Sequence, residues 1–109
     1  MIEDLIDYAE NEFSLSKTDK DGISVREHLE QVERQIGHKP EELKEVEFPV
    51  SMGHVWSAFV HIHSGRVPGQ PITYQDINAW KQLTETPLEP WTVDVIKRLD
   101  NVYMRTVNG

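Results

Sequence analysis

Apolar residues recur along this chain with the spacing of helices. In the first segment they fall three and four residues apart, at Ile2, Leu5, Ile6, Ala9 and Phe13. This spacing places them on one face of a helix. The same spacing recurs in four later segments, and no segment shows sustained strand alternation. The pattern predicts an all-α fold, a small bundle of about four to five short helices at residues 2–13, 24–36, 51–64, 73–84 and 90–107.

Start and stop signals mark several of these helices. Ser24 and Glu27 have the spacing of a capping box, in which each side chain satisfies a backbone amide at the helix start. Gly37 follows the last apolar position of the second helix, as a C-terminal cap does. Thr73 and Asp76 repeat the box in shorter form. The sequence therefore predicts where the second and fourth helices begin.

Each predicted helix has an apolar stripe. The stripe of the second helix consists of Val25, Leu29, Val32 and Ile36. We expect the buried face of the fourth helix to be Ile77, Trp80 and Leu83. The three tryptophans, Trp56, Trp80 and Trp91, all lie on such stripes, so a place in the core is favoured for each.

Two segments lack this pattern. Residues 14–23 are polar and end in Asp21-Gly22, a turn signal, so we expect a mobile loop. Residues 38–49 are acidic and lie between Pro40 and Pro49. A short helical turn from Pro40 to Lys44 is expected there, because proline fits the first position of a helix. The chain as a whole, residues 1–109, is expected to be a single helical domain.

Composition narrows this picture. Only 38% of the 109 residues are hydrophobic, so we expect a thin core that a partner or self-association completes. The absence of cysteine excludes disulfides and thiolate metal sites. No apolar run approaches the roughly 18–20 residues that span a bilayer. The N-terminal segment is acidic and short of apolar length, which is not typical of a signal peptide.

The net charge of −8 is concentrated in the first half. Residues 1–48 hold 14 acids and 6 bases, whereas residues 49–109 hold 5 of each. This distribution argues against nucleic-acid binding, which needs clustered Lys and Arg. It fits either a solvated surface or an acidic surface that attracts a basic partner or repels further copies of the chain.

Catalytic and metal-binding patterns are absent from the sequence. His54 and His61 lie seven residues apart on one helical face, about 10 Å from each other, which is too far for ligands of one ion. His61 and His63 point to different sides. There is no nucleophile-elbow pattern and no glycine-rich phosphate loop. The sequence therefore predicts no enzyme, no cofactor and no metal site.

The last two predicted helices follow each other as in a helix-turn-helix, the DNA-binding motif. The joint from Glu85 to Glu89 is longer than the usual 3–4 residue turn. The bases of the last helix are offset by Asp94 and Asp100. DNA binding is not favoured.

A series of short motifs runs through roughly residues 24–104. It includes Val25-Arg-Glu-His-Leu29, Gly37-His-Lys-Pro-Glu-Glu-Leu43 and Trp56-Ser-Ala-Phe59 with Arg66. It is densest in Pro71-Ile-Thr-Tyr-Gln-Asp-Ile-Asn-Ala-Trp80 and Leu88-Glu-Pro-Trp91, followed by Leu99-Asp100 and Tyr103. In these motifs and their order the chain resembles the small tail assembly chaperones of long-tailed phages and prophages. Thr92 departs from the pattern, which has an acid there, and the first helix lies outside it.

This resemblance implies a non-enzymatic role. Such chaperones keep the long, helical, aggregation-prone tape-measure protein soluble while tail-tube subunits assemble around it, and they are usually absent from the finished virion. The expected partners are the tape-measure protein, the tail-tube protein or both, with self-association also open and no nucleic acid or membrane. The expected location is the cytoplasm of the infected bacterium. The alternatives are a structural virion protein, such as a tail-completion or connector subunit, and a small regulator that binds a host protein.

Two apolar stripes are candidates for the contact with such a client. Because the apolar total is low and these stripes are very apolar, we expect the core not to use them wholly. The candidate partner-binding residues are Ile2, Leu5, Ile6, Met52, Val55 and Phe59.

Overall fold

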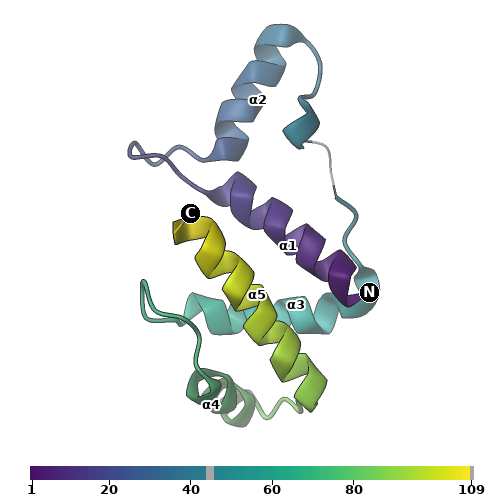
Figure 1. The fold of residues 1–109 in the computed structure, drawn as a ribbon, viewed down its shortest axis with the longest axis vertical. Helices are drawn as coiled ribbons and strands as arrows, with labels where there is room; N and C mark the ends of the chain where they lie inside the picture. The colour runs from purple at the N-terminus through teal and green to yellow at the C-terminus, as the bar shows by residue number, and fades with distance from the viewer. Residues whose placement is uncertain (44–45, 109) are drawn as a thin grey trace.

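The computed structural model describes residues 1–43 and 46–108, and in these ranges it is all-helical (Figure 1). The α-helices are α1 (Ile2–Ser16), α2 (Val25–Ile36), α3 (Gly53–Ser64), α4 (Tyr74–Thr84) and α5 (Pro90–Asn108). Two short 3₁₀ turns, η1 (Glu41–Leu43) and η2 (Val50–Met52), lie between α2 and α3. The five α-helices, with no strand among the described residues, confirm the predicted fold class.

The core forms where α1, α3 and α5 meet. α5 runs beside α1, and α3 packs against α5 from another direction (Figure 1). Leu5, Val55 and Leu99, one from each helix, are fully buried in the same cluster. Burying a side chain of this size contributes about 1.5–3 kcal/mol. The apolar stripes of these three helices therefore cover one another.

Aromatic rings extend this core between α1 and α3. The ring of Phe13 lies 5.8 Å from that of Phe59 and 6.0 Å from that of Trp56, measured between centroids. The ring of Tyr103 in α5 meets Phe13 edge-on at 5.3 Å. Tyr8 of α1 meets Trp56 edge-on, and burial raises the pKa of its hydroxyl. Such pairs contribute roughly 0.5–1.5 kcal/mol each beyond their buried area.

The helix ends that local sequence predicts are present. The Ser24 hydroxyl accepts a hydrogen bond from the Glu27 amide at 3.1 Å. Thr73 and Asp76 form a capping box, in which each side chain accepts a hydrogen bond from the backbone amide of the other. Gly37 ends α2 in the left-handed conformation, with φ of 82°. η1 supplies the helical turn expected after Pro40 as far as Leu43, and Lys44 lies outside the described residues.

The segment between α1 and α2 is shorter than the loop predicted over residues 14–23, and it contains specific hydrogen bonds. α1 continues to Ser16, so the turn begins at residue 17. The Asp19 carboxylate accepts the amides of Asp21 and Ile23 and contacts the His28 ring at 2.8 Å. The His28 ring, then the Ile23 amide, holds the pKa of Asp19 below its usual value. The turn therefore fixes α2 to the end of α1.

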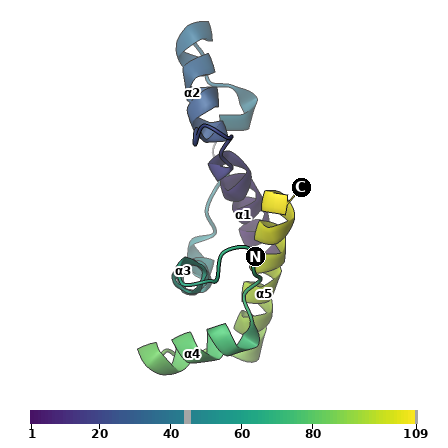
Figure 2. The ribbon, with the colours of Figure 1, turned by 90° about the vertical axis from the view of Figure 1, so that its left-hand side faces the viewer.

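α2 and α4 project from opposite ends of the core (Figures 1 and 2). The Cα radius of gyration is 15.7 Å, whereas a compact chain of this length is expected at about 13 Å. The dimensions of 49 × 31 × 22 Å show the same elongation. The protein thus has a small three-helix core, to which α4 contributes one buried residue, Ile77, and α2 contributes none.

Two expectations about buried residues are wrong for this reason. Leu83 in the last turn of α4 is 85% exposed, because α4 extends past the helix it packs on. Trp91 at the start of α5 is 40% exposed, and its indole N–H donates to Glu89. Trp56 and Trp80 are partly buried against the core.

Candidate interaction surface

Arg66 is the centre of a network that contains a buried ion pair. The guanidinium donates to the Asp100 carboxylate, and both side chains are buried. Its Nε donates to Nδ1 of His63 at 2.8 Å, and Nη1 donates to the Gln70 carbonyl at 3.2 Å. The guanidinium carbon lies 4.5 Å from the centre of the Tyr103 ring.

This network fixes the loop between α3 and α4 to the last helix. The other Asp100 oxygen accepts the Ile72 amide at 2.9 Å, and Lys97 donates to the Ile72 carbonyl at 2.6 Å. Since Arg66 already donates to protein acceptors on every side, an anion would have to displace Asp100 to bind there. Burial, followed by the nearby Arg66 charge, lowers the pKa of His63. The geometry is that of a structural anchor rather than of a catalytic centre.

The histidines of α3 lie against aromatic rings. His54 contacts Trp91, His61 contacts Trp80 and His63 stacks on Phe59, with ring centroids 6.1, 6.3 and 5.5 Å apart. Among the described residues, no three His, Asp or Glu side chains come together where they could hold a metal ion. In the same residues, no helix is both long enough and apolar enough to cross a membrane.

The residues predicted to contact a partner lie inside the protein. Leu5, Ile6, Met52, Val55 and Phe59 are buried in the main core, and Ile2 packs against it half-buried. The two stripes belong to one cluster, so they cover each other. This differs from the expectation that the core leaves them partly unused. A client could reach these side chains only by opening the core.

An exposed apolar stripe lies on α2. None of its residues is buried, and Val25, Val32 and Ile36 are between 38% and 49% exposed. Leu29 is half-buried on the same face. These four residues are called the α2 stripe below. Sequence periodicity identified the stripe, but periodicity does not distinguish a covered stripe from an open one.

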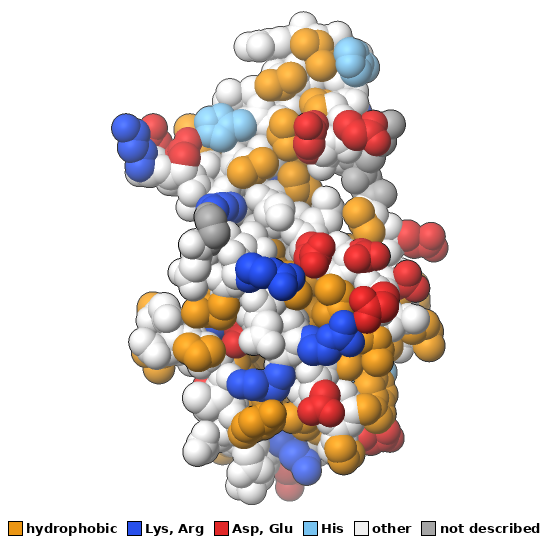
Figure 3. Space-filling model, viewed as in Figure 1, with side chains coloured by type: hydrophobic (Ala, Val, Ile, Leu, Met, Phe, Trp, Pro, Cys, Tyr) orange, Lys and Arg blue, Asp and Glu red, His pale blue; other side chains and the backbone are white. Residues whose placement is uncertain are grey.

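A shallow groove lies between the α2 stripe and α1. It encloses about 530 Å³ and is lined by Leu15, Val25 and Leu29 and by polar residues that include Asp7, Glu10 and Glu42, three acids that are all exposed. We call it the α1–α2 groove and these three acids its acidic rim. Figure 3 shows hydrophobic side chains along α2 with acidic side chains beside them. The groove therefore combines a buried or half-buried apolar lining, Leu15 and Leu29, with exposed acids.

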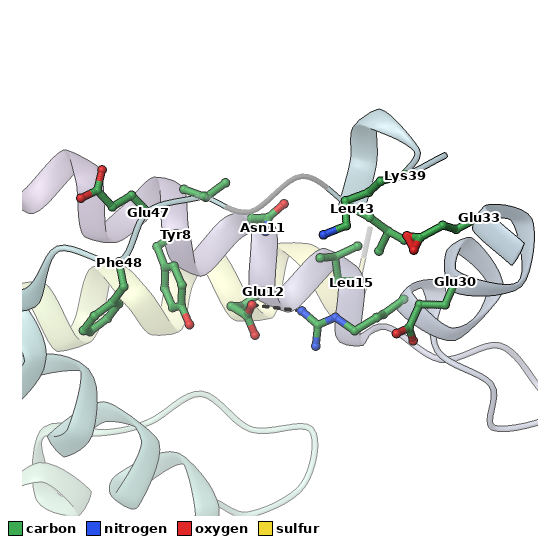
Figure 4. Close-up of a pocket in the computed structure, with 12 residues that line it drawn as sticks. Tyr8, Asn11, Glu12, Leu15, Glu30, Glu33, Lys39, Leu43, Glu47 and Phe48 are labelled. Carbon is green, nitrogen blue, oxygen red and sulfur yellow. Dashed lines mark hydrogen bonds and ion pairs between the residues drawn. The ribbon is translucent and has the colours of Figure 1, made fainter. Parts of the chain in front are cut away.

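A second hollow shares Leu15 with the α1–α2 groove (Figure 4). It encloses about 650 Å³, and Glu12 reaches across it to Arg26, with 3.0 Å between the carboxylate and guanidinium atoms. Its other charged residues are Glu30, Glu33, Lys39 and Glu47. This Glu12–Arg26 ion pair joins α1 to α2 and helps to fix the position of one helix relative to the other.

Comparison with known proteins identifies one family. A family model described as phage tail assembly chaperone matches residues 32–105, which is more than half of the chain. The match begins within α2 and includes the Arg66–Asp100 network and most of α5. No curated protein and no solved structure matches the chain.

Proposed function

Because the chain belongs to the phage tail assembly chaperone family, we propose that it binds the tape-measure protein, the tail-tube protein or both during tail morphogenesis. The role is non-enzymatic: the chain holds a client in a form that can still assemble. It acts in the cytoplasm of the infected bacterium and does not remain in the mature virion.

The family match carries this proposal, and the α2 stripe supports it. An apolar helical face that the protein does not cover itself can accept the apolar face of another helix. The acidic excess of residues 1–48 supports the same role. A net charge far from zero keeps a protein and its complexes dissolved while an apolar surface is occupied.

The test is co-expression of the tagged chain with the tape-measure and tail-tube proteins encoded by the same phage. We expect one of them to co-purify with the chain and to be more soluble in its presence. The control is an unrelated acidic helical protein of similar size, which should not increase that solubility. If neither tail protein is retained, the proposed function is wrong.

Mass spectrometry of purified virions separates this role from that of a structural subunit. A chaperone should be absent from mature particles or present far below one copy per particle. A stoichiometric amount of the chain in particles would instead identify a tail-completion or connector subunit.

A further inference from the structure

We propose that the α1–α2 groove is the docking site for a client helix that is apolar on one face and basic along its edges. This inference rests on the proposed function, because it names the surface that the client contacts. The bound segment is an amphipathic helix whose apolar side chains lie on the α2 stripe and whose Lys or Arg side chains meet the acidic rim.

The first argument is that α2 lacks the packing that normally stabilises a helix of its length. A 12-residue helix is marginal in water, and most helical stability in proteins comes from burying an amphipathic face. The main core contains no α2 residue. Leu15, which is buried beside α2, is also outside the main core. A partner that covers the stripe would supply the missing burial.

The second argument is charge. The α1–α2 groove is edged by three acids, and no Lys or Arg is among the described residues that line it. Arg105 reaches Glu10 from outside, at 3.4 Å between side chains that are both largely exposed, so this pair neutralises the rim weakly. An apolar floor with an acidic edge is complementary to an apolar helix with basic flanks.

The same charge argues against a second copy of the chain as the occupant. A symmetric pairing through this face would place one acidic rim against another, and the first half of each chain has a net charge of −8. Like charges brought together across an interface are unfavourable.

The length of the α2 stripe also fits a client segment. From Val25 to Ile36 the stripe spans about 17 Å, or three helical turns.

The experiment measures binding of a labelled peptide to the full chain by fluorescence anisotropy. The probe is a helical peptide of about 20 residues, about 30 Å long, with a leucine stripe flanked by lysines. A matched peptide has glutamate in place of every lysine. We expect the lysine peptide to bind at least about tenfold more tightly. Raising the ionic strength from about 0.1 M to 1 M, which shortens the Debye length from about 10 Å to 3 Å, should reduce this difference.

Substitutions in the chain locate the contact. Leu29→Asp should weaken binding of the lysine peptide at least about tenfold, because it places a charge in the apolar floor. Leu83→Asp is the matched control, with the same change on exposed α4 at the other end of the molecule, and should leave binding unchanged. Val32→Asp provides a second variant on the α2 stripe. Circular dichroism should show the wild-type helical content for all three, since none of these residues lies in the core.

A second pair of variants tests the rim. Asp7→Asn with Glu42→Gln should weaken binding roughly fivefold at low salt, since each exposed charge contributes about 0.2–1 kcal/mol. Asp94→Asn with Glu85→Gln removes the same charge from the opposite end and should change binding less than about twofold. If both double variants lose binding equally, net charge rather than the rim attracts the peptide, and the docking site is overturned.

Three other results would overturn the docking site. One is wild-type peptide binding by folded Leu29→Asp, and another is equal binding of the glutamate peptide. The third is a wild-type dimer in light scattering that Leu29→Asp dissociates, because a second copy would then cover the groove. Retention of a tail protein by Leu29→Asp at the wild-type level would remove the groove and leave the chaperone role intact. Failure of the wild-type chain to retain any tail protein would refute the chaperone role.

Discussion

Replacing Asp100 by alanine should destabilise the protein far more than replacing an exposed acid by alanine. Asp100 is 1% exposed on α5. It accepts hydrogen bonds from the Arg66 guanidinium and the Ile72 amide. The alanine variant therefore leaves a buried guanidinium without its carboxylate and a buried amide without its acceptor.

The expected magnitude follows from these two losses. Removing one partner of a buried ion pair costs about 3–5 kcal/mol, because the remaining charge stays out of water. An orphaned buried amide costs about 1–3 kcal/mol when no other acceptor replaces the lost one. The two terms overlap, so we expect a loss of about 3–5 kcal/mol. For a domain of this size, 3 kcal/mol lowers the Tm by about 12 °C or more.

The assay is urea unfolding, followed by tryptophan fluorescence and circular dichroism at neutral pH. Asp94→Ala, an exposed carboxylate on the same helix, is the control and should change the free energy of unfolding by less than about 0.5 kcal/mol. The double variant Arg66→Met/Asp100→Leu should be less destabilised than the sum of its single changes, because no charge remains buried. If Asp100→Ala unfolds within about 1 kcal/mol of wild type, the network does not anchor the loop as argued.

Three further predictions test other parts of the fold. His63 has a lowered pKa in the folded state, so the unfolded chain binds more protons below about pH 6.5. The contribution of His63 to stability should therefore be constant above that pH and fall as the pH drops toward the folded pKa. Urea unfolding at a series of pH values should show this slope, and His63→Gln should flatten it. Protonation there would also break the hydrogen bond from Arg66 Nε, and an unchanged slope in the variant would remove His63 as the cause. Phe59→Ala, at a residue 1% exposed, should cost about 3–5 kcal/mol in urea unfolding, and a cost below 1 kcal/mol would contradict its place in the core. Gly37→Ala should cost about 1 kcal/mol because φ is 82°, seen as about fivefold faster hydrogen exchange at the end of α2, and unchanged exchange would refute this role of the cap.

The parts of the fold that sequence predicted are those determined by neighbouring residues. Ser24 and Glu27 are three residues apart, so their mutual cap depends on little else. The left-handed conformation of Gly37 is likewise a local consequence of the chain having to leave the helix. Helix type and most boundaries followed from such signals, although α1 runs three residues beyond its last stripe residue.

The parts that could not be predicted depend on which helices meet. Leu83 has the spacing of a buried residue on α4, but α4 extends past its neighbour, so the side chain is exposed. Arg66 and Asp100 are 34 residues apart, and no local pattern indicates that they pair. The burial of the candidate contact residues depends on the same kind of information: the stripes with Leu5 and Val55 are apolar as predicted, but they cover each other in the core, whereas no residue of the stripe with Leu29 is buried.

The boundary of the family match falls between the Arg66–Asp100 network and most of the α1–α2 groove. The match from residue 32 to 105 contains Arg66 and Asp100, which hold the loop before α4 to α5. It excludes α1 and the first turns of α2, which supply Asp7, Glu10 and Leu29 to the α1–α2 groove. The anchoring network therefore lies within the matched residues, whereas most residues that line the α1–α2 groove lie outside them. Discrimination between clients requires a difference in binding free energy, and exposed residues of this kind can change it at little cost to the fold. Exchanging Asp7, Glu10 and Leu29 for the residues of a family member with a different client should therefore weaken binding of the basic helical peptide, whereas exchanging the loop around Arg66 should alter stability and leave peptide binding unchanged.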